Sequence, residues 1–302
     1  MQRATNVGNR IAARRRPPPG PLPTPDHYDP RWEPRGQRVP TFPGLISQAP
    51  TRAQIESARY REIVADLRQP FLYHRKQWEW CFAIQALTEG DFLVPGRRGL
   101  GFGVGTEPLG SYFAARGPSI LGTDQPPGSG ADDWAEHEQH ATGLDAIYHP
   151  ELCTRDVFEA RVAFRAVDMV EVPTDLSGFD FTWSSCALEH LGTLDAGWAF
   201  VERSLECLRP GGLAVHTLEL NVSSDADTIE AGPTVLYRRR DVRAFAHRLR
   251  VRGHRIRTTF FFGRDPYDRH VDMPPFRDPH LKVKIGGYVA TSFGLIITKT
   301  AR

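Results

Sequence analysis

A glycine-rich turn is the segment of this chain whose residue types and spacing most directly suit ligand binding. The turn at 101–105 (GFGVG) follows a short apolar segment and precedes a segment with helical spacing. Glycine lets the backbone bend tightly and approach a ligand closely, and the free N–H groups at the start of a helix suit a polar or anionic group. The turn by itself is compatible with several nucleotide-like ligands.

Two aspartates narrow the chemistry. Asp124 ends the apolar segment 119–124, and Asp168 lies near the end of the segment 162–169. A carboxylate at the end of the strand that follows a glycine-rich turn suits the paired hydroxyls of a ribose. An acidic side chain at the end of the next strand can accept a hydrogen bond from an adenine amino group. The pattern therefore favours a ligand that contains adenosine.

The elements that must position these residues alternate between strand-like and helix-like segments. Strands are predicted at 98–104, 119–124, 162–169, 179–185, 213–220, 254–263 and 288–299, and helices at 107–117, 153–161, 194–208 and 239–253. Such alternation predicts a parallel sheet with helices on both faces, and two closing strands after the last helix predict an antiparallel end. The segment 209–212 (RPGG) is predicted as a turn.

The rest of the chain divides into a tail, two covering helices and two insertions. Residues 1–45 are rich in proline and arginine and lack apolar periodicity, which predicts a disordered tail. Within 46–95, the segments 51–69 and 74–88 have helical spacing and are expected to cover one side of the ligand cleft. The main domain is expected over 96–302, with lid insertions near 125–150 and 264–287.

Composition excludes several classes of protein. The net charge of +2 is nearly balanced, so nucleic acid is not an expected partner. No apolar stretch reaches the roughly 18 residues of a membrane span, and no apolar run of a secretory signal follows the N-terminus. The cysteines form no CxxC pair or zinc-type spacing: Cys81, Cys153, Cys186 and Cys207. We therefore expect reduced thiols, a cytoplasmic location and no membrane contact.

Five segments, taken in order, resemble the motifs of class I S-adenosylmethionine-dependent methyltransferases of the type 11 group. They are GLGFGVGTEPLGSYFA, ILGTD, VDM, FDFTWSSCALEHL and CLRPGGLAVH. The resemblance implies a Rossmann-like fold with a seven-stranded, mostly parallel sheet and antiparallel last strands. It also implies S-adenosylmethionine as the cofactor, bound by Gly101, Gly103, Gly105, Asp124 and Asp168, with Met169 beside them.

One position departs from the family pattern. The family usually places an acidic residue two positions before the first motif glycine, and this chain has Gly99 there. We expect Glu107, just past the turn, to contact the methionine amino group in its place.

Methyl transfer to a hydroxyl needs a base, and histidines near the predicted strand ends are the candidates. His190 follows the fourth strand, His216 lies near the end of the fifth, and His270 lies with Asp272 in the loop between the last two strands. The same regions contain Glu189 and other potential ligands of a divalent cation. No ligand spacing supports such a site, so no metal is expected.

The expected acceptor is a small molecule, a sugar or another polyhydroxylated compound. This hypothesis rests on a set of aromatic and histidine side chains expected to line the cleft: Trp134, His137, His140, Tyr148, Tyr267 and His270. Two alternatives remain open. The first is a nucleotide-dependent oxidoreductase, although its GxGxxG motif would require glycine at position 106, which is Thr106. The second is a non-catalytic cofactor-binding module, which is supported by Gly99 in place of the usual acidic residue.

Overall fold

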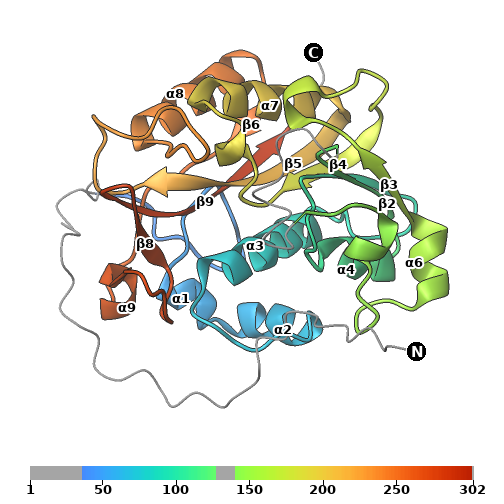
Figure 1. Ribbon diagram of the computed structural model, residues 1–302, viewed down its shortest axis with the longest axis horizontal. Helices are drawn as coiled ribbons and strands as arrows, with labels where there is room; N and C mark the ends of the chain where they lie inside the picture. The colour runs from blue at the N-terminus through green and yellow to red at the C-terminus, as the bar shows by residue number, and fades with distance from the viewer. Residues whose placement is uncertain (1–35, 127–139, 301–302) are drawn as a thin grey trace, which may run out of the picture.

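The computed structural model describes residues 36–126 and 140–300, and one mixed sheet forms its centre (Figure 1). Its strands are β1 (Arg98–Phe102), β2 (Ser119–Asp124), β3 (Val162–Ala166), β4 (Phe179–Ser184), β5 (Leu208–Asn221), β6 (Arg255–Ile256), β7 (Val271–Asp272), β8 (Lys282–Ile285) and β9 (Tyr288–Thr298). Their order is β3-β2-β1-β4-β5-β9-β8-β7, and β6 pairs with β9. The first five strands run parallel, and β9 is antiparallel to β5, β6 and β8. The predicted α/β fold class is confirmed.

The central strands are apolar because helices cover both faces of the sheet. All six residues of β4 are buried, as expected for a strand that lies inside a parallel sheet. Phe181 and Trp183 of β4 lie over Gly99 and Gly101 of the neighbouring β1, where a Cβ atom would overlap their rings. These glycines let two large aromatic side chains pack directly on the backbone of β1.

Helices form a layer on each face of the sheet (Figure 1). α3 (Arg75–Glu89) and α4 (Leu109–Arg116) lie on one face, and α7 (Leu194–Glu206) and α8 (Arg239–Val251) lie on the other. Trp198 of α7 stacks on Phe245 of α8 at 4.2 Å between ring centroids, which joins the second layer. α6 (Arg155–Arg161) packs against α4.

The N-terminal helices differ from the prediction in one detail. The predicted helix at 51–69 is two helices, α1 (Arg52–Ile55) and α2 (Ala58–Asp66), because the Ser57 hydroxyl accepts a hydrogen bond from Tyr60 N and starts a new helix. α2 packs on α3, so α3 is buried on nearly all sides.

Residues 1–35 of the predicted tail lie outside the described residues, but its last part is packed. The Gln37 side chain accepts a hydrogen bond from Phe260 N at 3.1 Å. Phe42 is 5% exposed and meets Tyr60 edge-on at 5.5 Å. The disorder predicted up to residue 45 is therefore wrong for 37–45.

Two further predictions are corrected in the C-terminal half. The segment 209–212 is not a free turn: it lies within β5 as an irregularity at which the pairing with β4 shifts register. The segment 264–287 contains α9 (Pro266–Arg269), β7 and β8, so the sheet has two short strands beyond the predicted seven. Within this insertion, β8 pairs with β9 and β7 pairs with β8.

The described part of the chain contains no helix that is long and apolar enough to cross a membrane. All four cysteines are buried and free.

Candidate functional site

The glycine turn lies where the prediction placed it, between β1 and α4. Gly103 and Gly105 have φ of +56° and +50°, which L-amino acids with a side chain rarely adopt. A Cβ atom on Gly103 would lie 3.0 Å from Ala187 Cβ and 3.3 Å from Met169 Sδ. The turn therefore lies against the segments that follow β3 and β4.

Asp124 is bonded directly to the turn. Its Oδ2 accepts hydrogen bonds from Gly105 N at 3.0 Å and Ala141 N at 2.9 Å, and its Oδ1 accepts one from Gln125 N at 2.8 Å. His140 Nδ1 lies 3.3 Å from Oδ1. A carboxylate has about four acceptor positions, and these three hydrogen bonds occupy all but one of them. A second ribose hydroxyl can bond to Asp124 only by replacing one of these donors, of which Ala141 is on the insertion.

Asp168 and Met169 lie beside the same turn. Asp168 Oδ1 accepts a hydrogen bond from Val170 N at 2.7 Å and so starts the short helix η3 (Met169–Glu171). This places Met169, which is 8% exposed, against Gly103. The predicted cofactor residues from the turn, β2 and β3 are thus brought together at the carboxyl edge of the parallel strands, where open α/β sheets bind ligands.

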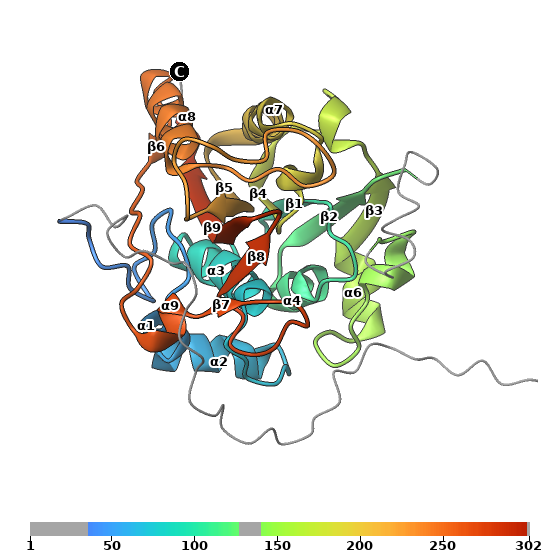
Figure 2. The ribbon, with the colours of Figure 1, turned by 60° about the vertical axis from the view of Figure 1, so that its left-hand side comes forward.

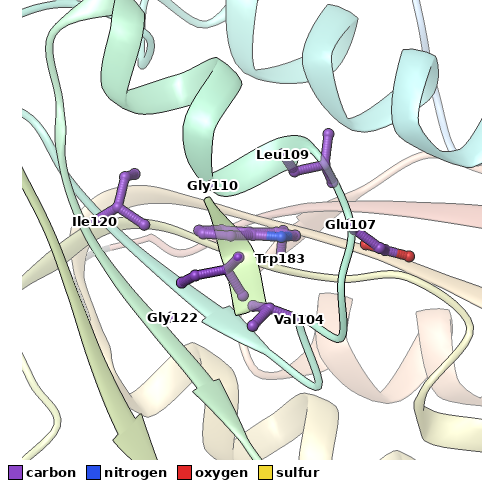
Figure 3. A pocket seen from close by; sticks show the side chains of 8 residues that line it. Val104, Glu107, Leu109, Gly110, Ile120, Gly122 and Trp183 are labelled. Atoms are coloured by element: carbon purple, nitrogen blue, oxygen red, sulfur yellow. The ribbon is translucent and has the colours of Figure 1, made fainter. Parts of the chain in front are cut away.

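Glu107, just past the glycine turn, lies near α3 and the segment after β4. Figure 3 shows its carboxylate directed away from the apolar side chains around Trp183, which pack next to α4 too closely to leave room for a water molecule. Burial raises the pKa of Glu107 to about 8, and the nearby Trp80 indole and Ser185 hydroxyl oppose that rise by favouring the charged form. The charge of Lys76 also lowers the pKa of Glu107, whereas the carboxylate of Glu79 raises it.

A buried ionic cluster under α3 is the feature that sequence reasoning missed. Arg75 Nη1 lies 2.6 Å from Glu219 Oε2 of β5 and 3.3 Å from Ser292 Oγ of β9. Glu79 Oε1 accepts hydrogen bonds from Cys186 Sγ at 2.9 Å and from the Ser292 hydroxyl. The sequence carried no clear signal for it, because charged residues such as Arg75 and Glu79 in a helical segment of mixed polar and apolar residues are typical of a solvent-exposed face.

We call this set the α3 cluster: Arg75, Lys76, Glu79, Trp80, Glu107, Ser185, Cys186, Glu189, Thr217, Glu219 and Ser292. It adjoins the glycine turn through Glu107 and through Ala187, the neighbour of Cys186. It reaches solvent at Lys76, whose side chain is 40% exposed and whose Nζ lies 3.8 Å from Glu79 Oε2. Burial raises the pKa of Glu219, and Arg75 opposes that rise.

His216 does not fit the predicted role of a base. It is fully buried, and Ser184 Oγ and Ser204 Oγ lie 2.8 and 2.9 Å from its two ring nitrogens. Burial lowers the pKa of His216 to about 3. With both nitrogens engaged by serines, His216 is a packed histidine between β5 and α7, and its prediction as a base is wrong.

His190 keeps a geometry suited to a base. Its Nδ1 lies 2.8 Å from the Pro233 carbonyl oxygen, which can only accept a hydrogen bond. The proton therefore sits on Nδ1, and Nε2 is the basic nitrogen in the neutral ring. His190 lies in η4 (Leu188–His190), directly after Glu189 of the α3 cluster.

His270 ends α9, and burial lowers its pKa while Asp272 opposes the shift. Asp272 is paired with another histidine, since His280 Nδ1 lies 2.6 Å from its Oδ2. His280 also stacks on His74 at 4.4 Å, next to Arg75. Asp272, the predicted loop neighbour of His270, is therefore paired with His280 in the structure.

The acceptor cleft expected from two converging insertions does not form among the described residues. Tyr148 packs on Phe158 of α6, whereas Tyr267 packs on Tyr73 near α1. Figures 1 and 2 show α6 and α9 at opposite ends of the molecule. Trp134 and His137 lie outside the described residues.

Within the described residues, one group has the proximity expected of metal ligands. Single ligand atoms of Cys186, Glu189 and Glu219 lie within 4.8 Å of one another. Burial raises the pKa of Cys186 well above its usual range, with Glu189 and Glu79 adding to the rise. A neutral thiol that donates to Glu79 is a poor metal ligand, because the thiolate is the binding form.

No protein-family model matches the sequence, and no curated protein matches it. Among solved structures, the chain is similar to phosphoethanolamine N-methyltransferase 2 of Haemonchus contortus, at 17% identity over 56% of this chain and 36% of that chain, with a TM-score of 0.38. It is also similar to magnesium protoporphyrin IX methyltransferase of Synechocystis, at 11% identity over 81% and 85% of the two chains, with a TM-score of 0.41. A third similarity is to the methyltransferase domain of a bacterial Hen1, at 13% identity over 74% and 97%, with a TM-score of 0.45. The chain thus spans about a third of the nematode enzyme.

Proposed function

We propose that this chain is an S-adenosylmethionine-dependent methyltransferase that acts on a small molecule. The observation that carries the proposal is the bonded unit formed by the glycine turn, Asp124 and Met169 at the carboxyl edge of β1 to β4. The unit combines a close backbone approach, a carboxylate and an apolar side chain, which suits a nucleoside with a polar tail. The sequence motifs for the family fall on these same residues.

The residues of the unit would divide the cofactor among them. The glycine turn would approach the methionine part of the cofactor, and Glu107 would contact its amino group. Asp124 would accept hydrogen bonds from the ribose hydroxyls. Asp168 and Met169 would contact the adenine. Position 99 cannot hold the acidic residue that the family usually places there, because a Cβ atom on Gly99 would overlap the Phe181 ring. The contact to the amino group is therefore assigned to Glu107. When bound, the cofactor supplies an activated methyl group on sulfur. The protein holds the acceptor in line and excludes water.

We infer that the acceptor oxygen belongs to a hydroxyl group, as in a sugar, and that His190 takes its proton. The Nδ1 contact with Pro233 supports a basic Nε2, as described above. The four free thiols support a reducing compartment, as in the cytoplasm.

Titration calorimetry with S-adenosylhomocysteine tests the proposal, with NADH as the competing ligand. We expect micromolar binding of S-adenosylhomocysteine that NADH does not displace. Binding of NADH instead would favour the oxidoreductase alternative, and no binding of either would reject the cofactor site. Cofactor binding without methyl transfer to a broad acceptor panel would favour the non-catalytic module.

A further inference from the structure

The α3 cluster contains polar atoms that the fold itself leaves without partners. Five of the ten buried side-chain nitrogen and oxygen atoms without a close hydrogen-bond partner in the described residues belong to it. Two of them, Trp80 Nε1 and Ser185 Oγ, face the Glu107 carboxylate, which leaves Arg75 Nε, Glu189 Oε2 and Glu219 Oε1. An unpaired buried polar atom costs about 1–3 kcal/mol, so native folds retain few of them. Their concentration beside the glycine turn indicates a binding site.

The two carboxylates are held close together. Glu189 is 1% exposed and forms no ion pair in the described part of the chain. Glu219 is held by Arg75 through Oε2, which leaves Oε1 without a partner. Ligand atoms of Glu189 and Glu219 lie within 4.8 Å of each other and of Cys186. Carboxylate oxygens of both residues therefore lie close together, next to the Arg75 guanidinium.

The mixture of donors and acceptors selects the ligand class. A metal ion would use the carboxylates but would lie beside Arg75 and against a protonated thiol. An amine would satisfy the carboxylates and leave Arg75 Nε without an acceptor, and an anion would do the reverse. Hydroxyl groups donate and accept at once, and two adjacent hydroxyls can meet both carboxylates and the Arg75 N–H.

We propose that the α3 cluster binds the methyl acceptor through a vicinal diol of a sugar, with Glu189 and Glu219 accepting from its two hydroxyls and Arg75 Nε donating to one of them. This inference rests on the proposed function, and it adds the acceptor site and its chemistry. The contact of Glu107 with Trp80 and Ser185 joins this site to the cofactor unit.

Saturation-transfer NMR on the complex with S-adenosylhomocysteine tests the proposal directly. The probes are glucose, mannose, galactose and rhamnose, with 2-deoxyglucose as the partner lacking one vicinal hydroxyl. We expect saturation transfer to at least one of the four sugars. Where glucose binds, 2-deoxyglucose should bind at least about tenfold more weakly, the scale of one lost hydrogen bond to a charged group.

Two variants and a matched control locate the site. Glu189→Leu removes an acceptor that has no ion pair, and Glu219→Gln keeps the shape and the hydrogen bond to Arg75. Both should weaken sugar binding at least about tenfold while the affinity for S-adenosylhomocysteine stays within about twofold. Glu206→Gln, on the exposed end of α7, should change neither affinity.

The outcomes separate this inference from the proposed function. If S-adenosylhomocysteine binds but no sugar does, or if both variants bind sugar as the wild type does, the diol site is rejected and the proposed function stands. Displacement of sugar by ethanolamine, or stoichiometric binding of Zn²⁺ or Mg²⁺ at the cluster, would replace it with an amine or a metal site. Failure of S-adenosylhomocysteine itself to bind would reject the proposed function.

Discussion

Asp124 has two roles at the residue scale, and both depend on its carboxylate. It is predicted to accept hydrogen bonds from the ribose hydroxyls, and it already accepts hydrogen bonds from Gly105 N and Ala141 N. Asp124→Ala should therefore weaken binding of S-adenosylhomocysteine by about 1–3 kcal/mol, or roughly 5- to 150-fold in Kd. Calorimetry measures the change, and Asp175→Ala, which removes an exposed partner of Arg165, is the control. Unchanged affinity in Asp124→Ala would remove the ribose assignment.

His216 provides a prediction about pH. Its pKa is lowered to about 3 by burial, whereas in the unfolded chain it is about 6.5. Below about pH 6.5 the unfolded chain binds a proton that the folded chain does not. The free energy of unfolding therefore decreases as the pH is lowered. The loss is at most about 1.4 kcal/mol per pH unit and ends near the folded pKa. His74, also lowered to about 3, acts in the same direction.

Urea unfolding at pH 7, 6 and 5 measures this dependence. His216→Gln keeps polar atoms between the two serines and should show a shallower loss of stability on acidification than the wild type. His247→Gln, on the exposed face of α8, should keep the wild-type slope. Equal slopes in the wild type and His216→Gln would show that His216 is protonated in the fold.

At the scale of elements, the contact between α3 and β9 positions the α3 cluster. A Cβ atom on Gly294 of β9 would overlap the Phe82 ring of α3. Gly294→Ala should lower stability by about 1–3 kcal/mol through overpacking, and it should weaken sugar binding by displacing α3. Gly110→Ala in α4 is the control, because nothing lies within 4 Å of its Cβ position and alanine favours a helix. Equal melting temperatures for the two variants would contradict this packing.

The N-terminal segment is a second prediction at this scale. Deleting residues 1–35 should leave the melting temperature and the affinity for S-adenosylhomocysteine unchanged. Phe42→Ala in the full chain should cost about 3 kcal/mol or more, because Phe42 packs on Tyr60. Thermal unfolding of both proteins tests the boundary. A large loss in the truncated chain would show that residues 1–35 are packed as well.

At the scale of the whole molecule, ligand binding should stabilise the fold by mass action. The unit of the glycine turn, Asp124 and Met169 joins residues from three separate segments. Its ligand is therefore expected to bind the folded chain and not the unfolded chain. At a hundredfold excess over Kd, S-adenosylhomocysteine should add about 2.7 kcal/mol to the free energy of unfolding. Chemical unfolding with and without the ligand measures this gain. A gain that does not grow with ligand concentration would contradict specific binding.

The sequence by itself determined the seven main strands of the sheet and the place of the glycine turn, Asp124 and Asp168 at the strand ends. Strand and helix periodicities are local, and the turn, Asp124 and Asp168 occupy strand ends, whose positions follow from chain order in a parallel sheet. These features could be predicted because neighbours in the sequence specify them. The break between α1 and α2 could not, since it depends on the Ser57 cap competing with a continuous apolar stripe.

Only the tertiary structure decided which side chains meet across elements. Arg75 and Glu219 are far apart in the chain and become an ion pair because α3 packs on β5. His216 is a candidate base by its place near the end of the fifth predicted strand, but β5 directs it toward the α7 layer, where Ser204 engages it. Periodicity predicts that a strand is buried, whereas the identity of each residue's partner depends on which helix covers that face, and long-range packing alone determines that choice.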